Sequence, residues 1–353
     1  MKAKNLRIGL LAAVAALAAG SFAGAARAQE QLVVVGWGGV WQEAYRKAVF
    51  EPFMKETGIK IVEDEFGGEY AKLTAQIDAG KVTWDLAAFE SPQVIQGCDE
   101  GTFSKLDWDK LGGRANQLDY AAHDCGIGSD VWATVMAYDA GKLAEGPKTW
   151  AEFWDVEKWP GKRGLYKDAR IMLEIALVAD GVPQKDIYEV LATPEGVDRA
   201  FGKLDELKPH ILWSESPADG MQRLLAGDVV MNVNFNARVT GAARENKRDL
   251  EIVWPAGFWV GTDYWVHIAE GPNPAAAQKF LEFYARPATQ AELVKYLTYG
   301  VPSKAAYELM SPEVKAELPT SPDRAQWVTS YSDEFWADRQ AALSERFNAW
   351  AAS

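Results

Sequence analysis

The stretch "VVVGWGGVWQEAYRKAVFEPFMKETGIKI", residues 33–61, decides the fold class, because it joins a β-branched run to an amphipathic segment through a glycine-rich turn. The run predicts a strand over 31–35, and the apolar residues that follow recur at helical spacing over 43–57. Gly58 stands where a glycine commonly ends a helix. The turn itself holds two tryptophans, so indole rings are expected where the strand ends.

Further elements of the same kind follow this stretch. The pattern predicts a strand over 59–66, a helix over 68–80 and a strand over 84–90. A βαβαβ order indicates an α/β fold with a parallel sheet covered by helices, and such sheets bind ligands at the carboxyl ends of their strands. Trp37 and Glu90 each follow the end of a strand, so we expect them to share one rim.

The N-terminus has the pattern of a secretory signal peptide. Three basic residues precede the apolar run 8–19, and the small-residue tripeptide 26–28 follows it. This predicts a leader over 1–28 and a periplasmic mature chain that starts at Gln29. The apolar run has 12 residues, fewer than the roughly 20 that a spanning helix needs, so no direct membrane insertion is expected. No cysteine follows the cleavage site directly, which argues against a lipid anchor.

Length and charge narrow the class of protein. The formal net charge is −13, and loss of the four basic residues of the leader makes it −17 for the mature chain. An acidic surface of this kind is a poor partner for nucleic acid. The mature length exceeds the roughly 250 to 300 residues at which one core stops growing, so the chain is expected to form two lobes.

The remainder of the chain carries alternating strand and helix signals. A strand is predicted over 130–140, and the second lobe is expected to begin near Tyr138. Residues 231–238 alternate apolar side chains with three asparagines and an arginine, which predicts a strand with one polar face. Other helices are predicted over 168–181, over 196–208, on both sides of Pro287 and over 333–350.

The two cysteines, Cys98 and Cys125, are expected to form one disulfide, because export places the chain in an oxidising compartment. The alternative is a pair of free thiols.

The order of several motifs resembles the type II periplasmic solute-binding proteins of ABC importers, in particular the spermidine/putrescine-binding group. The motifs are "FEPFMKETGIKI", "WDLAAFESPQVIQGCDEGTFSKLD", "LYKDARIMLEIAL", "GDVVMNVNFNAR" and "KFLEFYARPATQAELVKYLTYGVPSKAA". The resemblance implies two α/β lobes, hinge-crossing strands and a central ligand cleft. Lobe one would hold 29–137 plus 264–310, and lobe two 138–263 plus 311–353. It also implies a monomeric receptor, not an enzyme, that delivers a small amine to a membrane permease.

The resemblance also implies a set of ligand-binding residues. Such receptors pair ammonium groups with carboxylates and cover the aliphatic chain with aromatic faces. The matching positions are Asp168 and Asp263 as carboxylates, Phe235 and Tyr299 as aromatic walls, and Trp37 and Trp41 in the first turn. Glu90 is added as an acid at the end of the third strand.

The departures from the polyamine receptors point to a different ligand. Ile171 stands where a second acid is expected, Gly261 where an aromatic is expected, and Pro92 where a cleft tyrosine is expected. Arg238 replaces a small residue, and its guanidinium suits a carboxylate. If Arg238 and Asp263 both face the cleft, the site suits a molecule with one carboxylate and one ammonium, such as 4-aminobutyrate.

Each candidate also has a purely structural interpretation. Asp168 can cap the helix that follows it, Arg238 can form a structural salt bridge, and Glu90 can be a solvated loop acid. Trp37, Trp41 and Tyr299 can pack in the core.

Other functions also stay open. The same fold could bind a sugar or, through tyrosines, a ferric ion. An exported glycosidase would use two of Glu90, Asp168 and Asp263. No cofactor or metal is expected, since the three histidines lie far apart in the sequence.

Overall fold

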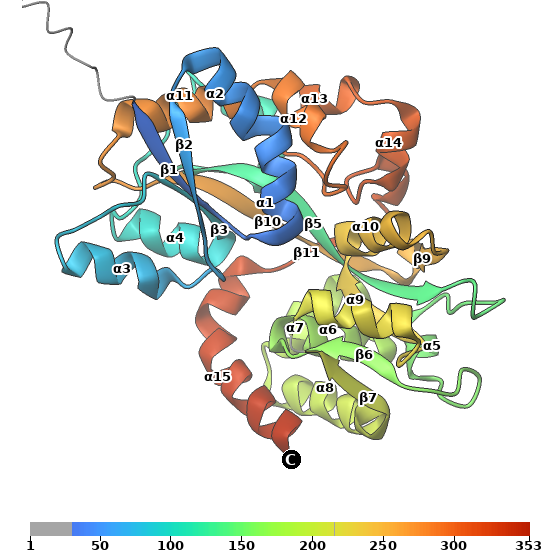
Figure 1. Ribbon diagram of the computed structural model, residues 1–353. Helices are drawn as coiled ribbons and strands as arrows, with labels where there is room; N and C mark the ends of the chain where they lie inside the picture. The colour runs from blue at the N-terminus through green and yellow to red at the C-terminus, as the bar shows by residue number, and fades with distance from the viewer. Residues whose placement is uncertain (1–29, 215) are drawn as a thin grey trace, which may run out of the picture.

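The computed structural model describes residues 30–214 and 216–353, so the predicted signal peptide lies outside the described residues. Helices gather into two lobes around one twisted mixed sheet, which runs from the upper lobe to the lower one (Figure 1). Its main path has the strand order β2-β1-β3-β10-β5-β8-β6-β7. The described chain is thus a two-lobed α/β protein.

The first lobe begins with the predicted βαβαβ unit. Strand β1 (Gln31–Gly36) pairs in parallel with β2 (Lys60–Glu65) and with β3 (Leu86–Glu90). The first helix begins earlier than predicted: α1 (Gly39–Tyr45) continues through a π-helical turn into α2 (Glu51–Thr57). Gly58 ends it with φ 73°, a left-handed conformation that glycine adopts at little cost.

Two long strands join the lobes at the centre of the sheet. Strand β5 (Gly126–Asp139) and strand β10 (Phe258–His267) are antiparallel partners, and β10 also pairs with β3. On its other edge β5 pairs with β8 (Met231–Phe235), which belongs to the second lobe. The crossing strands therefore carry side chains from both halves to one place. The exact division of the chain between the lobes stays a prediction.

The second lobe corrects one prediction. Strand β8 ends at Phe235, and Asn236 begins helix α10 (Asn236–Asn246), so Arg238 lies in a helix and not on a strand. The buried Asn236 amide donates to the Thr298 carbonyl at 2.7 Å and accepts from the Ala133 N–H at 3.0 Å. These side-chain hydrogen bonds fix the chain where it leaves the strand. The alternation over residues 231–238 does not indicate that the strand ends at Phe235.

The remaining elements complete both lobes. The strands are β4 (Ala122–His123), β6 (Arg163–Tyr166), β7 (Ile211–Ser214), β9 (Leu250–Ile252) and β11 (Val328–Ser330). The helices are α3 (Tyr70–Asp78), α4 (Ser91–Asp99), α5 (Trp150–Trp154), α6 (Ala169–Ala179), α7 (Ile187–Leu191), α8 (Pro194–Leu207), α9 (Pro217–Ala226), α11 (Pro274–Tyr284), α12 (Pro287–Leu293), α13 (Lys304–Glu308), α14 (Pro312–Glu317) and α15 (Asp333–Ala352).

Two long-range connections fasten these elements. The predicted disulfide is present: Cys98 in α4 is bonded to Cys125, just before β5. Helix α15 packs against both α4 and α6, and thus touches elements of both lobes (Figure 1). Within residues 30–214 and 216–353, none of the helices has the length and apolar character that crossing a membrane requires.

Candidate ligand-binding cleft

A cavity of about 300 Å³ lies where the crossing strands meet the two lobes. All eight predicted site residues line it: Trp37, Trp41, Glu90, Asp168, Phe235, Arg238, Asp263 and Tyr299. Residues that the sequence did not single out complete the wall, among them Phe66, Trp132, Tyr166, Arg170 and Leu297. The fold thus brings the candidates together, from segments more than 200 residues apart.

Three carboxylates form a row across the central strands. Asp263 on β10 lies opposite Glu90 on β3 and, on its other side, opposite Asp130 on β5. Directly opposed residues of antiparallel strands point to the same face, with Cβ atoms about 5 Å apart. Acidic groups are therefore concentrated along one line, and the sequence had pointed to only two of them, Glu90 and Asp263.

Glu90 is held by an arginine and is not a solvated loop acid. Its Oε2 accepts a hydrogen bond of 2.5 Å from Nη1 of Arg170 on α6. The guanidinium also lies 3.9 Å from Asp168, and it rests near the rings of Trp132 and Tyr331 at 5.7 and 5.5 Å. A signal for Arg170 was present in the sequence, because it belongs to the same "KDAR" motif as Asp168.

Asp168 caps a helix and also lines the cavity. Its Oδ1 accepts from the Arg170 backbone N–H at 2.9 Å and caps α6, and its side chain lines the cavity. Burial raises the pKa of its carboxyl, although the neighbouring Arg170 acts in the opposite direction.

Asp263 is nearly buried and is oriented by an indole. The Oδ1 atom of Asp263 accepts a hydrogen bond from Trp132 Nε1 at 2.9 Å. The residue as a whole is 5% exposed. Burial, and then the negative charges of Asp130 and Glu90, raise its pKa well above the usual value. A buried carboxyl of this kind gains a partner when a cation enters the cavity.

Arg238 extends from the first turn of α10 into the same cavity. Among the described residues no carboxylate lies within ion-pair distance of it, and its buried Nε has no hydrogen-bond partner. The alternative considered for Arg238, a structural salt bridge, is therefore not found in this part of the chain. Burial raises the pKa of the neighbouring Tyr299, and the positive charge of Arg238 opposes that shift.

The tryptophans of the first turn serve the core and the cavity together. Trp41 is 3% exposed, is stacked on Tyr45 at 4.0 Å, and donates from Nε1 to Asp130 Oδ2 at 2.7 Å. Trp37 is stacked on Phe66 at 5.4 Å, and its Nε1 has no partner. Core packing and cleft lining are therefore not exclusive for these rings.

Trp132 explains the unexpected glycine at position 261. The two residues are opposed on β5 and β10, and a Cβ on Gly261 would lie 2.2 Å from the Trp132 ring. The indole thus fills the space of the aromatic that the resemblance places at 261. Phe235 contacts the same indole edge-on at 5.2 Å.

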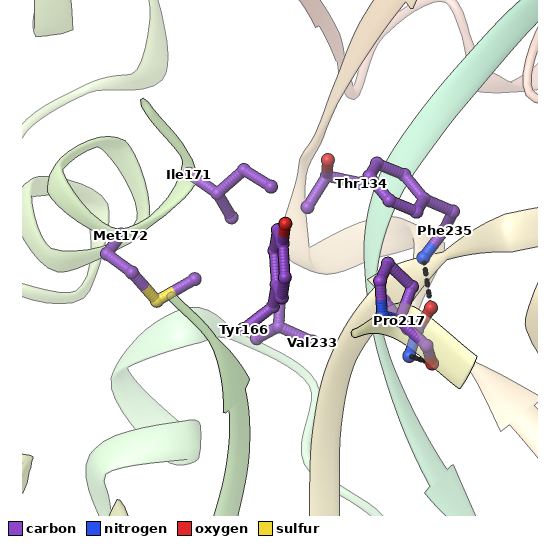
Figure 2. A pocket seen from close by; sticks show the side chains of 8 residues that line it. Thr134, Tyr166, Ile171, Met172, Pro217, Val233 and Phe235 are labelled. Atoms are coloured by element: carbon purple, nitrogen blue, oxygen red, sulfur yellow. Dashed lines mark hydrogen bonds between the residues drawn. The ribbon is translucent and has the colours of Figure 1, made fainter. Parts of the chain in front are cut away.

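A smaller apolar cavity of about 10 Å³ lies behind the main one, between α6 and β8 (Figure 2). The two spaces adjoin, because Tyr166, Pro217 and Phe235 line both of them. Ile171, at the position of the expected second acid, lines this apolar space together with Met172 (Figure 2). Among the described residues that line this end of the cleft there is no carboxylate.

Of the described His, Cys, Asp and Glu side chains, one group is compact enough to suggest a metal: Cys98, His123 and Cys125. The two sulfur atoms are joined in the disulfide, so they are not thiolate ligands. This group carries no metal site in the oxidised protein.

The sequence profile of the bacterial extracellular solute-binding proteins matches residues 48–320. The chain belongs to this family. Among characterised relatives of this solute-binding protein, a gamma-aminobutyric acid-binding protein of Pseudomonas aeruginosa is 45% identical over 333 residues, 94% of each chain. The spermidine/putrescine-binding periplasmic protein of Escherichia coli is 28% identical over 301 residues, 80% of this chain and 82% of the relative.

Solved structures agree with this assignment. The binding protein MotA of A. tumefaciens B6, in complex with glucopine, superimposes with a TM-score of 0.82 at 30% identity, and covers 91% of this chain and 99% of its own. A GABA receptor structure has a TM-score of 0.81 at 30% identity and covers 91% and 98%. The solute-binding protein described here thus has the two-lobed fold of ABC transporter substrate-binding proteins.

Proposed function

We propose that this solute-binding protein is the periplasmic receptor of an ABC importer for a small ω-amino acid, and that 4-aminobutyrate (GABA) is its ligand. The observation that carries the proposal is the guanidinium of Arg238, which has no ion-pair partner among the described residues and shares one cavity with the buried Asp263. A guanidinium and a carboxyl group, neither of them ion-paired among the described residues, match a ligand with a carboxylate and an ammonium.

The two ends of the ligand would bind different elements. Arg238 on α10, with the hydroxyl of Tyr299 beside it, would receive the carboxylate as a fork of N–H donors. Asp263 on β10 would receive the ammonium. Trp37, Trp41 and Phe235 would cover the methylenes and shield both ion pairs from water.

The same geometry disfavours a ligand that is cationic at both ends. Arg170 already pairs with Glu90 and lies near Asp168, so two of the three acids that line the cavity in the described part of the chain have a resident cation. A second ammonium would meet Arg238 or the apolar end at Ile171. Diamines and triamines such as putrescine and spermidine therefore rank second, supported by relatives that are 27–28% identical.

A receptor role is favoured over hydrolysis. A glycosidase needs one protonated and one ionised carboxyl that are both free to reach the substrate. Here Glu90 is paired with Arg170, and Asp168 caps α6. We infer that the chain binds its ligand without chemical conversion, as a monomer, and passes it to a membrane permease. Because a ligand that touches both lobes favours the closed form, closure would accompany binding.

Calorimetric titration tests the ligand. GABA is expected to bind, while putrescine, spermidine and a neutral sugar such as glucose bind at least about tenfold more weakly, the factor for one lost charged contact. Mass spectrometry of small molecules that copurify with the protein gives an independent answer. Binding of putrescine tighter than GABA would contradict the proposal, and so would binding of glucose alone.

A further inference from the structure

Asp130 lies behind the cleft wall, and no role follows for it from the site described so far. It is fully buried, its Oδ2 accepts from Trp41 Nε1 at 2.7 Å, and its Oδ1 has no hydrogen-bond partner. Among the described residues, no lysine, arginine or histidine forms an ion pair with Asp130 or with Asp263 opposite it. Two adjacent buried carboxyls thus lack a cation in the ligand-free protein.

The described side chains around the pair supply no ion-pair partner, although the positive charge of Arg170 opposes the rise in the pKa of Asp263. The hydroxyls of Tyr45 and Tyr284 both donate to the Ser129 carbonyl and so do not serve Asp130. Arg170 is bound to Glu90. Among the described residues, the titratable and charged groups near the pair are Glu90 on β3, Arg170 on α6, Tyr45 on α1, Tyr264 on β10, Tyr284 on α11 and Tyr299 after α12, and Arg238 on α10 lines the same cavity as Asp263.

Resting on the proposed function, we propose that Asp130 and Asp263 together hold one proton in the ligand-free protein, and that ammonium binding releases it to the solvent. Asp130 is then a positioning residue, which acts on the ligand through Asp263 and through the indole of Trp41. Two like charges in one buried site do not both ionise until a cation arrives.

The charges balance through this step. Before binding, the pair carries one negative charge; afterwards it carries two, and the ligand ammonium brings one positive charge. The proton that leaves is taken up by the buffer. A second observation, separate from the pairing of the strands, is that burial raises the pKa of Asp130 to about 7. The release of the proton is therefore expected near neutral pH.

The experiment is calorimetry of GABA binding at pH 6.5 in phosphate and in Tris, two buffers with different enthalpies of protonation. We expect a buffer-dependent enthalpy that corresponds to nearly one proton released per ligand, and an affinity that rises with pH from 5.5 to 7.5. Asp130→Asn is expected to lose the release. The matched control Glu174→Gln, at a buried acid on α6 outside the cleft, should keep it.

Three outcomes overturn the inference: equal enthalpies in both buffers for the wild type, an Asp130→Asn variant that still releases the proton, or a Glu174→Gln variant that loses it. If Asp130→Asn does not fold, the wild-type comparison still decides. If GABA does not bind, the proposed ligand is wrong. The same buffer comparison is then made with putrescine, which also carries an ammonium group. If neither binds, the ligand-free protein decides through the protonated-carboxyl infrared band at pH 6, which must weaken in Asp130→Asn.

Discussion

Arg170 reaches from α6 to Glu90 at the end of β3, with 2.5 Å between Nη1 and Oε2. The pair joins the two sides of the cleft, and both side chains are largely shielded from water, at 12% and 24% exposure. Because Arg170 occupies Glu90, Asp263 is the acid that remains available to the ligand ammonium.

Replacement of Glu90 by glutamine should therefore weaken ammonium binding. The guanidinium of Arg170 would then keep only its longer contact with Asp168 and would compete with the ligand ammonium for Asp263. Calorimetry should show GABA affinity lower by about tenfold, the size of one charged contact. Glu56→Gln removes a similar arginine pair, to Arg286, on an exposed surface and should change nothing. Unchanged GABA affinity in Glu90→Gln would mean that this pair has no electrostatic influence on the site.

Replacement of Asp263 by asparagine should weaken GABA binding by roughly 1.5 to 3 kcal/mol, as for a lost charged hydrogen bond. The amide oxygen can still accept from Trp132 Nε1, so the thermal midpoint of unfolding should not fall. The measurement is calorimetry together with a thermal melt. Wild-type affinity in this variant would remove Asp263 from the ammonium site.

Replacement of Arg238 by methionine should abolish measurable GABA binding and spare or improve putrescine binding, because the carboxylate loses its partner while a diamine loses a repulsion. Arg244→Met is the matched control on the same helix, where Arg244 is half exposed and paired with Glu317. An equal loss for both ligands in Arg238→Met would show that this arginine is structural.

The free energy of unfolding should depend on pH through Asp130. Its pKa is raised by burial to about 7, against about 3.9 in the unfolded chain, so the folded state holds more protons between these values. The contribution of Asp130 to the free energy of unfolding is therefore greatest below about pH 4. This contribution is lost as the pH rises through about 7. Thermal melts from pH 5 to 8 should show a smaller decline in Asp130→Asn than in the wild type; parallel curves would contradict the assignment.

Loss of the disulfide should destabilise the protein without changing its ligand. Cys98 and Cys125 are 27 residues apart, and closing a loop of this length is worth about 3 to 4 kcal/mol on the entropic model. Urea unfolding of the double alanine variant should show this decrease, with GABA affinity unchanged. A decrease below about 1 kcal/mol would mean that the bond adds little to the packing of α4 on β3 and β10.

Local patterns were sufficient for most elements because each depends on neighbours in the chain. The periodicity around Gly58, the cap at Asp168 and the helix that begins at Pro287 all appear as the sequence predicts. The start of α1 and the end of β8 were misplaced. There the boundary depends on packing and on bonds such as those of Asn236 to Ala133 and Thr298, which are distant in sequence.

The sequence by itself determined the fold class, the family and eight of the residues that line the cleft, because the order of the motifs and the chemistry of their residues can be read along the chain. Only the tertiary structure decided which of those residues contact one another and which remain available to the ligand. The opposition of Trp132 to Gly261, and the row formed by Glu90, Asp263 and Asp130, depend on the register between strands. Trp132 and Asp263 are 131 residues apart, and no local pattern specifies the alignment of strands so distant in the chain.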